Sequence, residues 1–206
     1  MPGPVAGIAL VGGSFLLGAI PWGYLTGRAA AGIDLRAVGS GGTGATNVLR
    51  TLGLRLSALV FVLDFAKGVI PVLAAAALGF APPWIAAAAV AAVAGHCWSP
   101  FIGFKGGKGV ATGAGAAISL FPPILAVLPI MAAVVWATRY VSLGSLVAAG
   151  LAALLATALA LTGRLDASAA VAIVAVATII FIRHEANIRR LLGGTERRIG
   201  ETVSVR

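Results

Sequence analysis

Three segments of this chain hold most of the residues that could do chemistry, and two of them are rich in glycine. The segment 104–112, FKGGKGVAT, combines two lysines with glycines, which let a backbone approach a ligand closely. A helix should begin near Val110, where unpaired amides would favour an anion. The segment therefore predicts a phosphate or carboxylate site formed by Lys105, Gly106, Gly107, Lys108 and Gly109. The alternative is a flexible loop whose lysines mark the cytoplasmic side of a membrane.

The second segment, 39–50, reads GSGGTGATNVLR. It matches the G-x-G-x-x-G spacing of dinucleotide-binding proteins, but its flanks read as apolar helices and lack the required strand. Arg50 offers a fork that suits phosphate, and side-chain hydrogen bonds are available from Ser40, Thr43, Thr46 and Asn47. The segment thus reads either as a second anion-binding turn or as the capping of a helix start.

The third segment, 183–200, reads RHEANIRRLLGGTERRIG. His184 and Asn187 are three residues apart, so on a helix they share a face. The arginines that follow could bind anionic lipid.

Three ionisable side chains fall within or near apolar stretches. Asp64 and Lys67 are functional candidates because charge is costly in a membrane, although their spacing also allows a structural ion pair. His96 could line a site or be a satisfied polar residue of the bundle. The single cysteine, Cys97, excludes an internal disulfide and a multi-cysteine metal site, and we expect no metal.

The elements that position these segments must lie in a membrane. The chain has 206 residues, of which 60% are hydrophobic and 10% are charged, whereas soluble domains carry about 25% charged residues. We therefore predict an all-α integral membrane protein with one domain, residues 1–206. The net charge of +9 suits anionic headgroups and substrates better than nucleic acid in such a chain.

The apolar stretches predict seven transmembrane helices. The fourth and fifth stretches are short and flank Pro122-Pro123, so five spans plus a re-entrant hairpin is the alternative. No Lys or Arg precedes Arg28, which favours a retained first span over a signal peptide. The stretches are 4–25, 56–80, 84–102, 110–121, 124–138, 143–163 and 167–183.

The basic residues predict the orientation. Arg164 would lie on one face and Lys67 within a span, and the opposite face would hold the other 13 of the 15 basic residues. The positive-inside rule then places the N-terminus outside and the C-terminus in the cytoplasm, with the three segments on the cytoplasmic face. Those 13 are Arg28, Arg36, Arg50, Arg55, Lys105, Lys108, Arg139, Arg183, Arg189, Arg190, Arg197, Arg198 and Arg206.

Together and in this order, the motifs GSGGTGATNVLR, LDFAKG, GHCWSPFIGFKGGKGVAT and HEANIRRLLGGTE resemble the bacterial membrane acyl-phosphate:glycerol-3-phosphate acyltransferases. The resemblance covers nearly the whole chain. It implies a seven-span enzyme of the bacterial cytoplasmic (inner) membrane, without a cofactor, that makes lysophosphatidic acid from acyl phosphate and glycerol 3-phosphate among membrane lipids. Gly42 departs from the family, which usually has Asn there.

The resemblance also implies residue roles. The residues expected to contact the substrates are Ser40, Arg50, Lys108, His184 and Asn187. Gly106 and Gly107 would form part of a phosphate site, Thr46 and Asn47 would help to hold phosphate, and Glu196 would be structural. An acyl phosphate is already activated, so we expect direct transfer without an acyl-enzyme, the proton going to His184 or to the donor phosphate. An anion transporter is the rival hypothesis, although the predicted outer connections have few polar residues.

Overall fold

The computed structural model describes residues 1–201, and over this range it is helical, without strands. Arg206, one of the basic residues used to predict orientation, lies outside the described residues. The described range also contains two 3-10 turns, at Pro100–Ile102 and at Pro122–Val127 (η2). The helices are α1 (Pro4–Ala19), α2 (Trp22–Ala31), α3 (Ala45–Leu52), α4 (Leu54–Ala77), α5 (Pro82–Cys97), α6 (Val110–Leu120), α7 (Leu128–Thr138), α8 (Val141–Leu161), α9 (Ala167–Arg183) and α10 (Glu185–Leu192).

The all-helical membrane architecture predicted from composition is confirmed. Four segments in the described range are long and apolar enough to cross a bilayer: Pro4–Ala31, α4, Pro82–Ile102 (α5 with the 3-10 turn that follows it) and α8. A fifth candidate is α9, which α10 continues after a bend of 60°. The shorter apolar elements are α6 and η2 with α7, which meet at Pro122 as the proline pair predicted. The count of seven spans stays a prediction.

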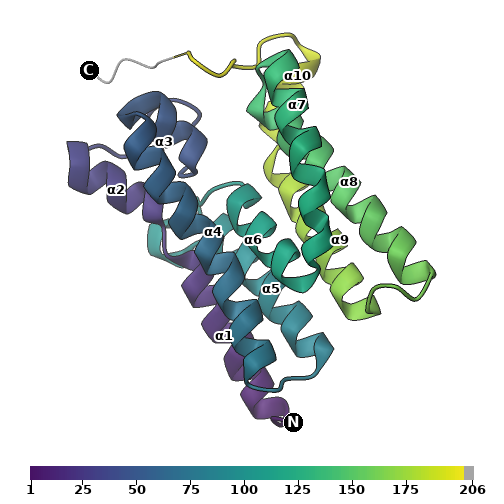
Figure 1. Cartoon of the computed structure of the whole chain (residues 1–206). Helices are drawn as coiled ribbons and strands as arrows, with labels where there is room; N and C mark the ends of the chain where they lie inside the picture. The colour runs from purple at the N-terminus through teal and green to yellow at the C-terminus, as the bar shows by residue number, and fades with distance from the viewer. Residues whose placement is uncertain (202–206) are drawn as a thin grey trace.

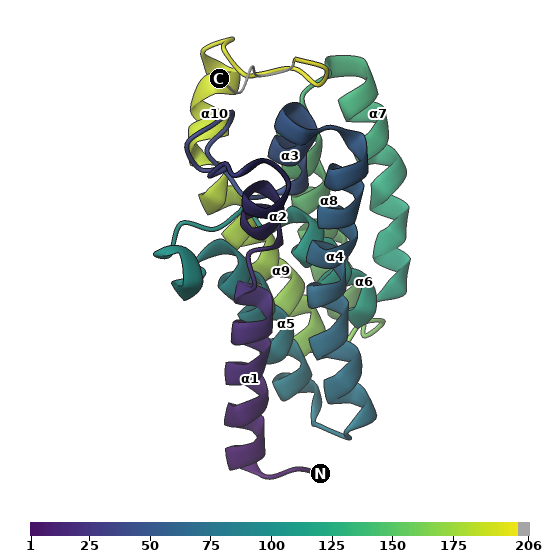
Figure 2. The same ribbon diagram turned by 90° about the vertical axis from the view of Figure 1, so that its left-hand side faces the viewer.

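The chain runs between the two ends of one elongated bundle. The N-terminus lies at one end, and α2, α3 and α10 gather at the other (Figure 1). A quarter turn shows the same separation, with α1 and α4 leading from one end to the other (Figure 2). An odd number of crossings requires the ends of the chain to separate in this way, so the arrangement agrees with either predicted count.

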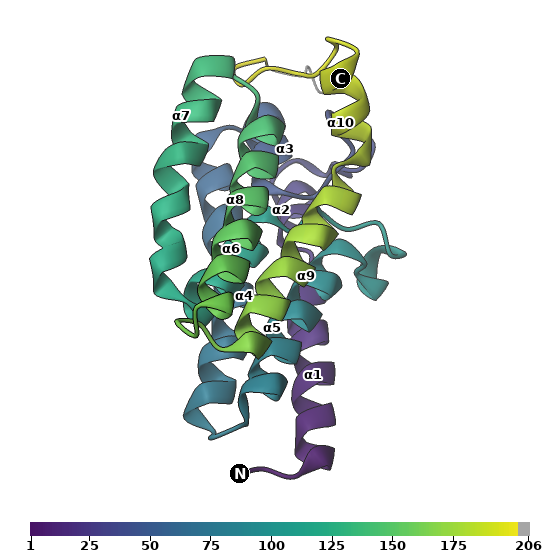
Figure 3. The ribbon, with the colours of Figure 1, turned by 90° about the vertical axis from the view of Figure 1, so that its right-hand side faces the viewer.

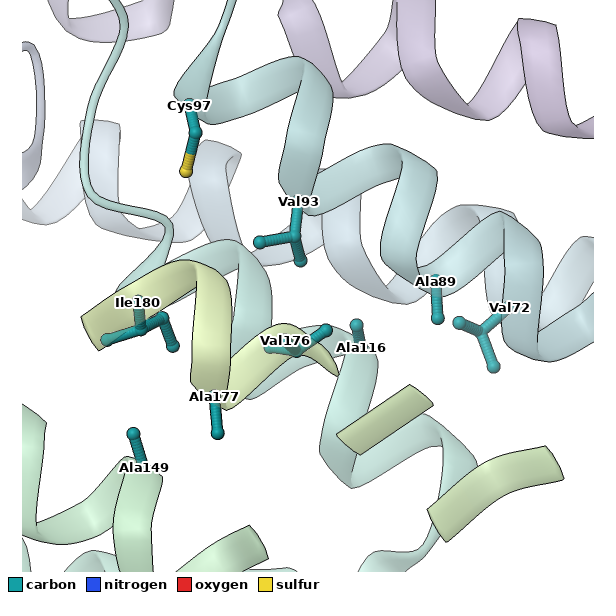
Figure 4. Packing of buried hydrophobic residues seen from close by; sticks show 9 residues of the cluster. All are labelled: Val72, Ala89, Val93, Cys97, Ala116, Ala149, Val176, Ala177 and Ile180. Carbon is teal, nitrogen blue, oxygen red and sulfur yellow. The ribbon is translucent and has the colours of Figure 1, made fainter. Parts of the chain in front are cut away.

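Small residues allow the helices to pack closely. A Cβ at Gly18 of α1 would overlap the carbonyl of Ala92, and one at Gly68 of α4 would overlap the carbonyl of Thr112 on α6. Close approach through glycine and alanine is the usual basis of helix association in a membrane. The central cluster joins α4, α5, α6, α8 and α9 (Figure 4) and consists of Val72, Ala89, Val93, Cys97, Ala116, Ala149, Val176, Ala177 and Ile180.

The helix α7 stands at the edge of the bundle beside α8 (Figure 3). None of its residues is buried, and it packs mainly on α8 and η2. One wall of the space described next is therefore held less firmly than the core.

Candidate active site

A cavity of about 460 Å³ brings the three glycine- and histidine-containing segments together. Lys105, which was predicted to hold phosphate, is exposed and lies outside this lining, so its role stays a prediction that the cavity does not support. Gly106 is buried and also outside the lining. The other predicted site residues all line the cavity: Ser40, Thr46, Asn47, Arg50, Gly107, Lys108, Gly109, His184 and Asn187.

Asn47 builds the loop between α2 and α3. Its Oδ1 accepts the backbone N–H of Ser40 at 2.9 Å, and its Nδ2 donates to the carbonyls of Leu35, Val38 and Gly42 at 2.9, 3.1 and 2.9 Å. The side chain is buried and both of its polar atoms have partners. In this arrangement Asn47 positions the loop that carries Ser40, and its predicted role in holding phosphate stays a prediction.

A second contact ties this loop to the connection after α5. Arg36 forms an ion pair with Asp34 at 2.7 Å and donates through Nη1 to the carbonyl of Ile102, also at 2.7 Å. The hydrogen bond from Arg36 lowers the pKa of the Asp34 carboxyl to about 2. The sequence analysis missed this contact, although the spacing of two residues between opposite charges was visible.

The backbone of Gly106 and Gly107 is already engaged by the protein. Their N–H groups donate to the carbonyls of Cys97 and His96, at 3.2 and 3.1 Å. Their carbonyls accept from Arg183, Nη2 to Gly106 at 3.3 Å and Nε to Gly107 at 3.1 Å. A Cβ at Gly106 would overlap the carbonyl of His96, and one at Gly107 would overlap the His96 ring. The absence of a Cβ at these glycines is therefore needed for loop packing, and the expectation that their backbone also meets phosphate stays a prediction.

The second half of this segment carries the groups that suit an anion. Lys108 lines the cavity, and Gly109, with φ of +80°, is the N-cap of α6. The amides of the first turn of α6 point out of the helix end, where they favour negative charge. Arg183 donates to the carbonyls of Gly107 and Gly106, a role that the sequence did not predict. Its position immediately before His184 was the feature of the sequence that could have indicated a role at the site.

His184 follows the last residue of α9 and is held in one tautomer. Its Nδ1 lies 2.8 Å from the carbonyl of Ile180, which can only accept, so Nδ1 carries the proton. Burial, and then the nearby Lys108, lower the pKa of His184 to about 4. The imidazole is thus neutral at pH 7 with Nε2 as an acceptor.

Glu196 organises the C-terminal segment of the site. It accepts hydrogen bonds from Asn187 Nδ2 at 2.6 Å, Ser142 Oγ at 2.8 Å and Arg190 Nε at 2.7 Å. Burial opposes its ionisation, but these three donors outweigh burial, and the pKa of Glu196 is lowered. Asn187 consequently has its amide nitrogen committed to Glu196. These three hydrogen bonds agree with the structural role that the resemblance implies for Glu196.

Two cations at the polar end of the cavity have no acidic partner within residues 1–201. Neither Arg50 nor Lys108 forms an ion pair there, and the buried Nε of Arg50 lacks a hydrogen-bond partner. Nη2 of Arg50 donates to the carbonyl of Arg197 at 3.3 Å. Burial lowers the pKa of both cations, that of Lys108 to about 8. An unpaired guanidinium and ammonium in one partly buried space suit a dianionic ligand.

The opposite wall of the cavity is apolar and reaches the surface of the bundle. It is formed by α4 and by Met131 of α7, and Phe61 and Val62 of α4 are 49% and 59% exposed. A smaller apolar slot between α6, α7, α8 and α9 adjoins the cavity at Val110 and Met131. The lining of the apolar slot includes the small residues Gly113, Ala114, Ala117, Ala148, Ala149 and Ala152 among larger aliphatic side chains. The site is therefore polar at one end and open to an apolar surface at its side.

Comparison with known proteins gives one consistent result. A family model described as glycerol-3-phosphate acyltransferase matches residues 8–194. The glycerol-3-phosphate acyltransferase of Geobacter sulfurreducens is 45% identical over 186 residues, covering 90% of this chain and 93% of that protein. That of Synechococcus sp. (strain CC9902) is 47% identical over 200 residues, covering 96% and 97%.

Solved structures agree. The structure of PlsY, an integral membrane glycerol 3-phosphate acyltransferase, in its glycerol 3-phosphate form matches with a TM-score of 0.87 at 38% identity. Its lysophosphatidic acid form matches with a TM-score of 0.85 at 37% identity. Both matches cover 95% of this chain and 96% of the other.

Proposed function

Because this chain belongs to the glycerol-3-phosphate acyltransferase family and is an acyltransferase, we propose that it transfers a fatty acyl group from an acyl phosphate to the 1-hydroxyl of sn-glycerol 3-phosphate. The products are lysophosphatidic acid and phosphate. The observation that carries this proposal is the cavity with Arg50 and Lys108 unpaired at its polar end and an apolar wall at its side. Such a space fits a phosphate together with a fatty acyl chain.

The two cations would divide the work of holding phosphate. Arg50 presents a planar fork that can bind two phosphate oxygens, while Lys108 acts as a point charge beside the first turn of α6. Ser40, with its backbone fixed by Asn47, offers a hydroxyl at the same end. These groups stabilise negative charge both on the bound substrate and on the departing phosphate.

The reaction proceeds by direct transfer. The 1-hydroxyl oxygen attacks the acyl carbonyl carbon, the bond from that carbon to the phosphate oxygen breaks, and phosphate leaves with the electron pair. His184, neutral and with its pKa lowered to about 4, is a weak base but a well-oriented acceptor through Nε2. We therefore assign it to orienting the hydroxyl, and the donor phosphate takes the proton. Asn187, fixed by Glu196, lines the cavity beside it.

The acyl chain would enter from the bilayer between α4 and α7, lie along the apolar wall and extend past Met131 into the apolar slot. Exposed Phe61 and Val62 on α4 and the loosely held α7 support this route, because a lipid-soluble donor needs a lateral entrance. The phosphate end would remain with Arg50 and Lys108. Both substrates then meet where the polar and apolar parts of the cavity join.

We further propose a single domain of seven transmembrane helices in the bacterial cytoplasmic membrane, with the site facing the cytoplasm. The gathering of α2, α3 and α10 at one end of the bundle supports a one-sided site (Figure 2).

Turnover in detergent tests the proposed function against the rival anion transporter. Purified protein in micelles, without a sealed compartment, should form lysophosphatidic acid from acyl phosphate and glycerol 3-phosphate. A transporter would show no turnover there. Acyl transfer that requires a thioester donor would contradict the acyl-phosphate proposal while keeping the family assignment.

A further inference from the structure

Three buried ionisable side chains have no role in the reaction described above, although two of them, Asp64 and His96, line the cavity. Asp64 and Lys67 lie on α4 and His96 lies on α5, and their exposed fractions are 2%, 2% and 6%. Lys67 Nζ is 2.9 Å from Asp64 Oδ1 and donates to the carbonyl of Ile20 at 2.8 Å. Such groups are costly to bury, so a fold that keeps them beside a cavity invites a functional explanation.

His96 connects this pair to the glycine loop. Its Nδ1 lies 3.6 Å from Asp64 Oδ1, too far for a hydrogen bond, and within the described residues this nitrogen has no other hydrogen-bond partner. Its Nε2 edge occupies the place where a Cβ of Gly107 would lie. Its own carbonyl accepts the N–H of Gly107 at 3.1 Å. His96 therefore touches Gly107 with both its ring and its main chain.

Lys108 is the next residue along the chain, and its side chain lines the cavity. A continuous series of contacts thus runs from the end of α1 through Lys67, Asp64 and His96 to the peptide that precedes Lys108. Arg183 holds the same peptide from the other side, through the carbonyl of Gly107. The loop is fixed between these two supports.

We propose that His96, anchored by Asp64 and Lys67, is a positioning residue that sets the place of Lys108 in the site. The inference rests on the proposed function, because the phosphate that Lys108 receives is that of the substrate. Removing this support lets the loop shift, and a shift of about 1 Å in a binding group is enough to lower its efficiency strongly.

A double-mutant cycle between residues 96 and 107 tests the proposal. Gly107→Ala should raise the KM for glycerol 3-phosphate because its methyl group meets the His96 ring, and His96→Ala should raise it roughly tenfold through loss of the support. In the His96→Ala background there is room for the methyl group, so adding Gly107→Ala should change KM by less than about twofold. Independent, multiplying effects would mean that the methyl group blocks phosphate itself, and would overturn the proposal.

The charged anchor needs its own variant. Asp64→Asn alone would leave Lys67 buried without a partner, so the double variant Asp64→Asn/Lys67→Gln removes both charges together. We expect it to fold and to show a KM for glycerol 3-phosphate raised roughly tenfold, with a smaller change in kcat. A purely structural role would instead reduce the amount of active enzyme, which lowers kcat and leaves KM unchanged; that result would overturn the assignment.

Ser99→Ala is the matched control. Ser99 Oγ donates to the carbonyl of Ala19 at 2.6 Å, a buried bond between the same helix ends that does not involve Gly107. This variant should keep the wild-type KM. Binding of glycerol 3-phosphate measured by calorimetry without any acyl donor should follow the same order as KM. If the wild-type protein binds glycerol 3-phosphate but does not use acyl phosphate, the proposal that acyl phosphate is the donor fails. The affinities of the wild type and the variants for glycerol 3-phosphate would still decide the role of His96.

Discussion

Lys108 is a buried cation whose charge depends on pH near the physiological range. Burial lowers the pKa of its ammonium to about 8, so the free site loses this charge as pH rises through that value. A substrate phosphate keeps its two negative charges over the same interval, since its second pKa is about 6. We therefore expect the KM for glycerol 3-phosphate to rise between about pH 7 and pH 9.5.

Lys108→Arg is the control for that pH dependence. A guanidinium stays charged throughout this range, so the KM of the variant should be nearly constant with pH, although higher at pH 7 because the contact geometry changes. A parallel rise in both proteins would assign the titration to another group.

Gly42 is the position where the chain departs from the family pattern. Its carbonyl accepts from Asn47, but a Cβ at this residue would find Ser40 Oγ as its nearest neighbour, at 3.9 Å. There is space for a side chain that lines the cavity. Gly42→Asn should therefore fold normally and lower the KM for glycerol 3-phosphate about two- to fivefold by adding an amide donor beside Ser40. Steady-state kinetics and a thermal unfolding curve check both parts, and an unchanged or raised KM would contradict the prediction.

Single residues show where sequence reasoning succeeds and where it stops. One cavity is lined by five residues whose polar or charged side chains made them candidates in the sequence: Ser40, Arg50, Lys108, His184 and Asn187. The glycines of the loop show where sequence reasoning stops, because a missing Cβ leaves room equally for a ligand or for a neighbouring ring. Only the packed structure shows that the ring of His96 fills that room.

At the scale of elements, α8 carries the prediction about the acyl chain. The apolar slot is lined by Ala152 on this helix, whereas Leu154, two residues on, is 69% exposed. If the chain extends from the cavity past Met131 into the slot, Ala152→Leu should shift preference towards shorter acyl phosphates. Leu154→Phe should leave the preference unchanged.

Competition between donors of different chain length measures this shift. The activity of Ala152→Leu with the shortest donor should remain close to that of the wild type. This result would show that the leucine fills the slot without disrupting the fold. An unchanged preference in a stable Ala152→Leu protein would instead place the chain wholly along α4, at the lateral opening near Phe61.

Element boundaries were predictable where composition changes sharply. The proline pair ends α6 and begins the η2 turn, as proline after a helix should. The division of the first apolar stretch into α1 and α2 was not foreseen, nor was the bend of 60° between α9 and α10. Hydropathy is continuous across the first of these breaks, and the second depends on contacts of Glu196 with residues distant in the sequence.

At the scale of the whole molecule, orientation decides whether the proposed site can reach its water-soluble substrate. Within the described residues, the helices α2, α3 and α10 lie at the end opposite the N-terminus (Figure 1). They carry Arg28, Arg50, Arg189 and Arg190, four of the residues that the positive-inside rule assigns to the cytoplasm. The geometry of the bundle and the charge bias therefore support the same proposed arrangement, with the N-terminus outside.

Reporter fusions test this arrangement directly. A reporter that is active only in the cytoplasm should be active when it is fused after residue 206 and inactive when it is placed before Pro4. A fusion in the loop between α8 and α9, near Arg164, should be silent, because an even number of crossings separates the N-terminus from that loop whether or not α6 and η2–α7 both span the membrane. Silence at Arg164 together with activity after residue 206 is the result we expect. Activity before Pro4 would reverse the orientation and place Arg50 and Lys108 on the side without glycerol 3-phosphate.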